Sequence, residues 1–194
     1  MNMSTISKMR KQLQRGFTLV ELLIVVIILA ILAAVVVPQF ANTTQDANVA
    51  ALDSNLANVR SALDLYAQQH NGTYPGSVAA TGGTCAGTTG TGVLNSEDAL
   101  LDQLAFYTNA AGQACSSRSD GLGNANAFPF GPYLKKRELP LNPITGVRTL
   151  VIVSAGDLNM TATDTDGWMY DTVTGKFIAN DTAQDPNGRA FSTH

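Results

Sequence analysis

One long apolar run dominates the first part of the chain. No polar side chain occurs from Leu22 to Val37, and the predominantly apolar stretch begins at Phe17. At about 1.5 Å per helical residue, residues 17–37 cover about 30 Å, the thickness of the hydrocarbon core of a bilayer. The run therefore predicts a membrane-spanning helix over residues 17–37.

After Pro38 the pattern becomes amphipathic. Apolar residues recur at intervals of three and four with polar residues between them, as expected for a helix with one packed face. They are Val49, Leu52, Leu56, Val59, Leu63 and Tyr66. The stripe predicts that the helix continues over residues 38–70 and stops at Asn71-Gly72. Packing against a globular head is favoured over a coiled coil because the stripe covers few heptads.

Residues 71–194 alternate turn-rich and regular segments, which predicts a head domain. Gly and Thr dominate residues 76–92, as in a long loop, and Ser96 precedes two acids and a Leu pattern typical of a capped helix ending near Tyr107. The β-rich segments are 149–153, 168–170 and 176–178. They predict a three- or four-stranded antiparallel sheet, with the last two segments as a hairpin. The fold class is thus α+β, a long helix packed on a small antiparallel sheet.

Charge is distributed unevenly and predicts the orientation of the span. Lys8, Arg10, Lys11 and Arg15 precede the apolar run without an acid, whereas eight basic and fifteen acidic residues follow Gly16. Positive charge before the span predicts a cytoplasmic N-terminus and an exported body. The acidic body argues against a broad nucleic-acid surface.

Two simpler interpretations of the N-terminal segment compete with a specialised helix. A secretory signal is disfavoured because the run is long and no small-x-small cleavage site precedes Asn42. A plain single-span anchor leaves Glu21 unexplained, since a carboxylate in a bilayer segment costs about 2.5 to 3.5 kcal/mol on insertion scales.

The segment from Arg15 to Ile24 reads Arg-Gly-Phe-Thr-Leu-Val-Glu-Leu-Leu-Ile. It resembles the class III prepilin leader of the type IV pilin and type II secretion pseudopilin family. The resemblance implies that residues 1–16 are a leader, that prepilin peptidase cuts after Gly16, and that the new amine of Phe17 is methylated. It also implies a pilin-like fold, a bacterial inner-membrane location, and a periplasmic or cell-surface filament. The implied partners are further copies of the chain, the inner-membrane assembly platform, and other minor pilins or pseudopilins.

Two helix residues match the family at assembly positions. Glu21 falls at the fifth mature position, and Pro38 falls where such helices often carry a bending proline. The amine of Phe17, in the same or a neighbouring subunit, is a candidate partner for Glu21, and such a pair would set the stagger between packed helices. Snorkelling of the Glu21 carboxylate to the interface is the alternative.

Part of the head also resembles the major pseudopilin of type II secretion systems. The resemblance rests on Gly131-Pro132-Tyr133-Leu134, the following proline-rich connection, and the predicted hairpin that contains Trp168. The segment after Pro143 lacks the Trp-Gly-Asn-Pro pattern of that family. The prediction is therefore a filament subunit, without a choice between pilus and pseudopilus.

Two cysteines and a group of acids are the remaining candidate chemistry of the head. Cys85 and Cys115 lie on the exported side, where an even count favours a disulfide over two free thiols. Asp164 and Asp166 alternate before a glycine, a pattern that suits Ca²⁺, and Asp157 adds a further carboxylate. A polar turn is the competing interpretation of these acids.

The sequence contains no assembled catalytic motif, so an enzyme is not predicted. Two function classes remain. The first is a structural subunit that polymerises through its N-terminal helix. The second is a minor pilin whose head is a binding module for DNA, a surface or a secreted substrate.

Overall fold

The computed structural model describes residues 17–194, apart from the side chains of residues 37–42. The chain divides into two compact units, with the boundary between Thr43 and Thr44. The proposed leader, including Gly16, and the side chain of Pro38 lie outside the described residues.

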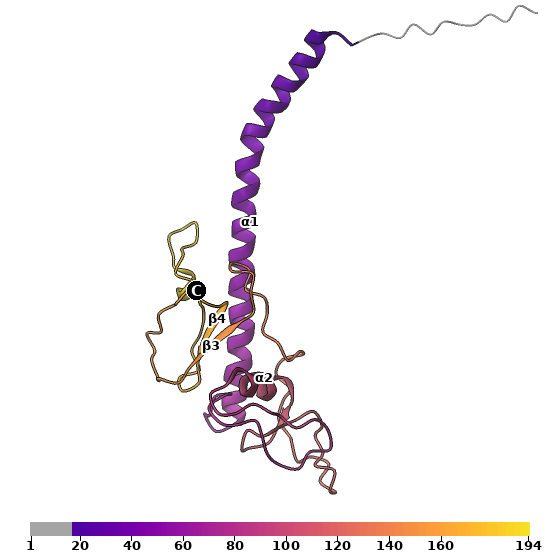
Figure 1. Cartoon of the computed structure of the whole chain (residues 1–194), viewed down its shortest axis with the longest axis vertical. Coiled ribbons are helices and arrows are strands. Elements are labelled where there is room, and N and C mark those ends of the chain that lie inside the picture. Colours follow the sequence, from indigo (N-terminus) through magenta and orange to yellow (C-terminus); the bar gives the residue numbers. More distant parts are fainter. Residues whose placement is uncertain (1–16) are drawn as a thin grey trace, which may run out of the picture. The chain divides into compact units, whose positions relative to one another are not determined.

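Helix α1 spans Leu19–Gln69, which confirms the predicted helix to within two residues at its start (Figure 1). Its C-terminal stop is the predicted one. Asn71 and Gly72 have φ values of 56° and 83°, in the left-handed region that a glycine adopts at low cost. The N–H of Gly72 donates to the carbonyl of Ala67 at 2.8 Å and so satisfies one of the last helical carbonyls.

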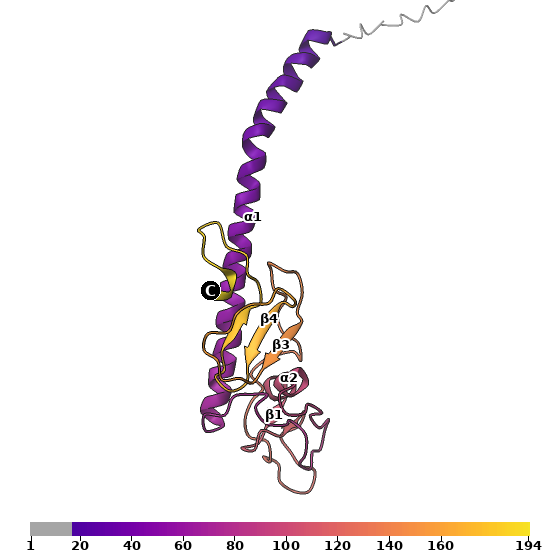
Figure 2. The ribbon, with the colours of Figure 1, turned by 60° about the vertical axis from the view of Figure 1, so that its left-hand side comes forward.

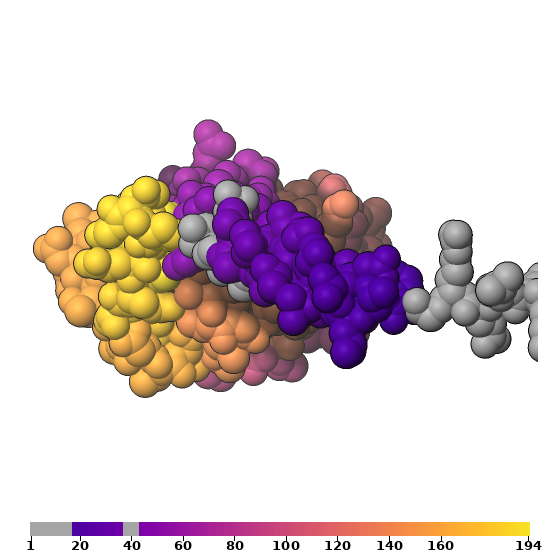
Figure 3. Space-filling view, turned by 90° about the horizontal axis from the view of Figure 1, so that it is seen from above, coloured from indigo at the N-terminus to yellow at the C-terminus, as the bar shows by residue number. Residues whose placement is uncertain are grey.

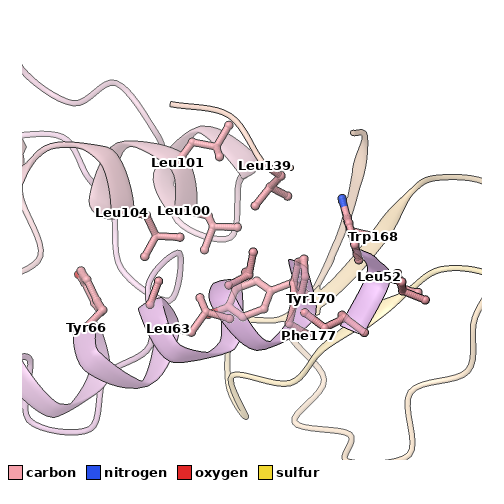
Figure 4. Close-up of a cluster of buried hydrophobic side chains, with 14 of the residues drawn as sticks. Leu52, Leu63, Tyr66, Leu100, Leu101, Leu104, Leu139, Trp168, Tyr170 and Phe177 are labelled. Atoms are coloured by element: carbon pink, nitrogen blue, oxygen red, sulfur yellow. The ribbon is translucent and has the colours of Figure 1, made fainter. Parts of the chain in front are cut away.

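The amphipathic stripe of α1 forms one side of the head's core. Five of its six predicted residues are buried, and Val49 is partly buried against them. Figure 4 shows these side chains facing residues from the second helix and the sheet. The core residues outside α1 include Leu100, Leu104, Leu139, Trp168, Tyr170, Phe177 and Phe191. Packing on the head, rather than coiled-coil pairing, is therefore the use of the stripe in this chain.

Helix α2 spans Glu97–Ala105 and begins where the sequence predicts. The side chain of Ser96 caps it by accepting a hydrogen bond from the N–H of Ala99 at 3.1 Å. Asp102 and Gln103, which the sequence pattern did not mark as core residues, are both buried.

The main sheet is mixed, which corrects the prediction of an antiparallel sheet. It has the order β3-β4-β5, with β3 at Leu150–Val153, β4 at Trp168–Asp171 and β5 at Phe177–Ala179 (Figure 2). Strands β4 and β5 form the predicted antiparallel hairpin, but β3 pairs parallel to β4. A parallel neighbour requires a crossover instead of a tight turn, and residues 154–167 supply it.

Hydrogen bonds hold this crossover in place and explain why the parallel arrangement is stable. The N–H of Asp157 donates to the Asp171 carboxylate at 2.8 Å, and the N–H of Thr163 donates to Asn180 Oδ1 at 2.7 Å. Asp171 and Asn180 are themselves fully buried. Backbone N–H groups of the crossover thus provide these two buried side chains with the hydrogen bonds that water would otherwise supply.

The remaining elements are short. Strands β1 (Tyr107–Thr108) and β2 (Ala114–Cys115) form a two-stranded antiparallel sheet, and a 3-10 helix, η1, spans Phe191–Thr193.

Candidate functional site

The start of α1 is built as a reciprocal cap between Thr18 and Glu21. The Glu21 carboxylate accepts from the Thr18 N–H at 2.9 Å and from its hydroxyl at 2.7 Å, while the Glu21 N–H donates to Thr18 Oγ1 at 3.2 Å. This is the capping box, in which a residue and the one three positions later satisfy each other's backbone donors. The arrangement gives Glu21 a local role that the sequence analysis did not include.

The apolar part of α1 exposes its side chains on every face. The window Leu19–Val36 has a mean hydropathy of 3.3 and no residue buried within the described structure. By length and composition this helix can cross a membrane. Burial of these side chains therefore requires lipid or other protein chains.

Cys85 and Cys115 form a disulfide with a Cα separation of 5.8 Å, as predicted. The loop that precedes and follows Cys85 is also hydrogen-bonded along β2. The N–H of Gly90 donates to the Ala114 carbonyl at 2.8 Å, and the N–H of Ser116 donates to the Thr88 carbonyl at 2.9 Å. The Gly/Thr-rich segment is therefore anchored by backbone bonds as well as by the disulfide.

Two of the three carboxylates proposed for calcium, those of Asp157 and Asp164, accept hydrogen bonds from the protein. Thr182 donates both its N–H and its hydroxyl to Asp164, and these bonds lower the pKa of the Asp164 carboxyl. Asp157 accepts from the N–H of Asn159 at 2.7 Å. Over residues 17–194, no group of three or more His, Cys, Asp or Glu side chains is arranged to hold a metal ion. The calcium site with Asp157, Asp164 and Asp166 stays a prediction that this arrangement does not strengthen.

A buried polar cluster at the end of α1 is a feature that sequence reasoning missed. The ring of His70 stacks on that of Tyr66, with the centroids 3.7 Å apart. The His70 Nδ1 lies 2.9 Å from the Tyr66 carbonyl oxygen, and Nε2 lies 3.0 Å from the Thr108 hydroxyl. Burial lowers the pKa of His70 and outweighs its hydrogen bonds to carbonyl groups. One feature of the sequence indicates this burial: His70 follows Tyr66, the last residue of the apolar stripe, by four positions and so continues the same helix face.

A second missed cluster joins α2 to the neighbouring loops. The buried Asp102 carboxylate accepts from the N–H groups of Thr91 and Gly92, at 2.8 and 3.1 Å, and pairs with Arg137 at 2.5 Å. Arg137 also pairs with Asp98 at 2.6 Å. Arg137 is thus paired with two acids of α2.

The comparisons with known proteins cover at most about a third of the chain. Residues 11–37 match the family model described as the prokaryotic N-terminal methylation motif. The start of the chain therefore carries a prokaryotic N-terminal methylation motif, and this match supports a pilin or pseudopilin family.

The relatives include a type II secretion protein and type IV pilus proteins. The chain is similar to type II secretion system core protein G of Klebsiella michiganensis, with 42% identity over 67 residues, which are 34% of this chain and 46% of the relative. It is also similar to the type IV narrow pilus major component PilA5 of Thermus thermophilus, with 47% identity over 58 residues, or 30% of this chain and 50% of the relative. A third relative is the type IV major fimbrial protein FimA of Dichelobacter nodosus, with 44% identity over 54 residues, or 28% of this chain and 35% of the relative.

The chain spans about half or less of the length of these relatives. No solved structure matches it. The similarity confirms the predicted pilin or pseudopilin resemblance, and the structure itself has the predicted α+β, pilin-like layout. The pilin-like segment contains Phe17 and Glu21, whereas the disulfide and the buried clusters of the head lie largely outside it.

Proposed function

We propose that this chain is a structural subunit of a type IV pilus-like or type II secretion pseudopilus filament. The observation that carries the proposal is the methylation motif at residues 11–37, which overlaps an apolar helix, Leu19–Val36, with no residue buried. Its relatives are structural pilins and pseudopilins, and no catalytic role is proposed.

The proposal assigns a role to each part of the chain. Residues 1–16 are the leader that prepilin peptidase removes after Gly16, and the exposed amine of Phe17 is then methylated. Residues 17–37 first anchor the subunit in the inner membrane with the head exported, and then pack with further copies in the filament. Residues 38–70 join this segment to the head, and residues 71–194 form the head's remaining surface.

Substitutions at Glu21 test the assembly proposal. Its carboxylate has two candidate partners, one in its own helix and one in a neighbouring subunit. In the structure it accepts two hydrogen bonds from Thr18. In a filament, the amine of Phe17 from a neighbouring subunit would provide a full opposite charge in an apolar environment. The local cap requires only a hydrogen-bond acceptor at residue 21, whereas the charge pair requires a negative charge there.

Substitution by glutamine separates the two roles. Glutamine at this position retains the capping-box geometry but carries no charge, whereas alanine loses both. We expect Glu21→Gln and Glu21→Ala to insert, to be processed after Gly16, and to accumulate as membrane monomers. Thr18→Ala is the matched control, since it removes both hydrogen bonds of the Thr18 hydroxyl and keeps the charge of Glu21, and it is expected to assemble.

The measurement is fractionation of membranes from sheared filaments, with the intact mass and N-terminal sequence of each subunit. A mature chain that begins at Met1, or one cut beyond Val37, contradicts the prepilin assignment. Normal assembly of Glu21→Gln with failure of Thr18→Ala means that the carboxylate acts only as a helix cap.

The minor-pilin alternative is tested in the same preparation. A structural subunit is the main component of the purified filament, whereas a binding subunit is present in a small fraction. Mass spectrometry of the filament proteins therefore distinguishes the two.

A further inference from the structure

Strand β3 has an unpaired edge. In the parallel ladder Leu150 lies opposite Trp168, and the Trp168 N–H donates to the Thr149 carbonyl at 3.0 Å. The Thr172 N–H donates likewise to the Val153 carbonyl at 3.0 Å. Parallel pairing alternates along a strand, so residues 149, 151 and 153 bond to β4. The N–H and C=O groups of Leu150 and Ile152 consequently point away from the sheet.

These outward groups have no protein partner in residues 17–194, where no backbone or side-chain hydrogen bond reaches them. The strand reads Leu-Val-Ile-Val, and all four residues are partly exposed. It carries no charge, proline or bulge, which are the usual devices that keep an edge strand from pairing. Helix α2 contacts β3. At the C-terminal end of β3, the Thr172 N–H donates to the Val153 carbonyl, and the Thr172 hydroxyl donates at 2.8 Å to Asn95, which precedes α2.

A basic groove includes Arg148, which lies just before the start of β3. Lys135, Lys136 and Arg148 line it together with residues of α1, and its volume is about 250 Å³. The only acid in its lining is Glu138, which meets Lys136 at 3.4 Å and Arg148 at 3.9 Å. Arg148 is only two residues from the start of β3. A segment that pairs with β3 would therefore meet positive charge at that end.

The crossover loop 154–166 has the complementary properties. It contains Asp157, Asp164 and Asp166 and no basic residue, and the side chain of Leu158 within it is 67% exposed. In Figure 3 the orange residues that include this loop lie at the outer surface beside the yellow C-terminal segment. Figure 1 shows the loop on one side of α1 and the segment before β3 on the other.

We infer that the free edge of β3 in one subunit pairs with the loop 154–166 of a second copy of this chain. Backbone hydrogen bonds to Leu150 and Ile152 would provide the contact, and the aspartates of the loop would lie against Lys135, Lys136 and Arg148. Strand addition of this kind draws affinity from main-chain bonds and specificity from the flanking side chains.

The geometry suits a filament because the two surfaces are different patches of the same molecule. A contact between unlike patches is head-to-tail, and repetition of such a contact gives a helical polymer when the rotation does not close. The inference rests on the proposed function, and it assigns the head, in addition to the N-terminal helix, a specific contact between subunits.

Residue-resolved hydrogen exchange tests the pairing on the full processed chain, as detergent-solubilised monomer and as purified filament. We expect the amides of Leu150 and Ile152 to exchange at least about tenfold more slowly in the filament. The amides of Val151 and Val153 already bond to β4, so they are the internal control and are expected to be slow in both states. Equal exchange of Leu150 and Ile152 in both samples overturns the inference and leaves the filament function intact.

Carbodiimide cross-linking of filaments that mix ¹⁴N and ¹⁵N subunits identifies the occupant. We expect isotopically mixed links from Lys135 or Lys136 to an aspartate of the loop 154–166. Lys176 is the control for contacts within one chain, because its ammonium donates to the Leu158 carbonyl of its own loop, next to Asp157, so a link from Lys176 to Asp157 should be unmixed. Links from Lys135 or Lys136 to another protein, or only within one chain, overturn the assignment to a second copy. A chain that forms no filament contradicts the proposed function and this interface together.

Discussion

At the scale of single residues, the most informative positions are polar groups that the apolar pattern does not predict. His70 and the Tyr66 hydroxyl are both buried at the end of α1, and the hydroxyl has no hydrogen-bond partner among the described residues. Burial raises the pKa of Tyr66 well above its ordinary value of 10.0. A sequence pattern marks Tyr66 as a core residue, but the partners of these groups come from segments such as Thr108, distant in the chain.

The buried imidazole predicts how stability depends on pH. The unfolded chain binds a proton at His70 near 6.5, whereas the folded chain does so only at lower pH because burial lowers the pKa. The unfolded state therefore binds more protons between these two pKa values, so the free energy of unfolding falls as pH drops below about 6.5. The loss ends once pH is below the pKa of the folded state.

Urea denaturation of the full chain in detergent, followed by fluorescence of the single, buried Trp168, measures this effect. One proton gives a slope of at most about 1.4 kcal/mol per pH unit. The His70→Gln variant is expected to lose this slope, although its stability at pH 8 will also differ. Equal slopes for the two proteins between pH 7 and 5.5 would show that His70 is not the responsible group.

At the scale of elements, the sequence predicted what depends on local pattern. Both ends of α1, the Ser96 cap of α2 and the hairpin of β4 and β5 follow from periodicity, capping residues and turn signals. The parallel pairing of β3 does not, because it depends on Asp171 and Asn180 receiving hydrogen bonds from the crossover. Likewise, the acid Asp102 occupies a buried position of α2 only because Arg137 and two loop N–H groups satisfy it.

The disulfide leads to a prediction for the Gly/Thr-rich loop and β2. In the chain-entropy model, closing a loop of about 30 residues stabilises the fold by about 3 to 4 kcal/mol. The double variant Cys85→Ser, Cys115→Ala removes the link but leaves the backbone bonds of Gly90 and Ser116. We expect it to fold, with unfolding free energy reduced by about 3 kcal/mol and faster proteolysis within residues 81–92.

Urea denaturation and limited proteolysis measure the two effects, and the wild-type chain treated with reductant is the matched control. The reduced wild type should behave like the double variant. A variant as stable and as protease-resistant as the oxidised wild type would mean that the backbone bonds alone hold the loop.

At the scale of the whole molecule, the chain combines two units with opposite requirements. The N-terminal unit exposes apolar side chains throughout Leu19–Val36, whereas the unit from Thr44 onward has its own hydrophobic core and more acidic than basic residues. An apolar helix of this kind is a poor solute by itself but suits lipid or a bundle of like helices. The same helix can therefore serve both a membrane-anchored subunit and a filament.

The division at Thr44 predicts that the head folds without the apolar segment. A chain of residues 44–194 retains the α1 stripe from Val49 to Tyr66 and all of the core cluster. We expect it to be a soluble monomer without detergent, with the Cys85–Cys115 disulfide formed, and with an unfolding free energy within about 1 kcal/mol of that of the head in the full chain.

A chain that begins at Ala57 is the matched control, because it lacks Leu52 and Leu56, which are 0% and 1% exposed. Loss of two buried leucines costs at least about 4 kcal/mol, so this shorter chain should be unfolded or strongly destabilised. Size-exclusion chromatography and Trp168 fluorescence in urea test both chains. Aggregation of the 44–194 chain, or equal stability of the two, would place the boundary of the folded head elsewhere than at Thr44.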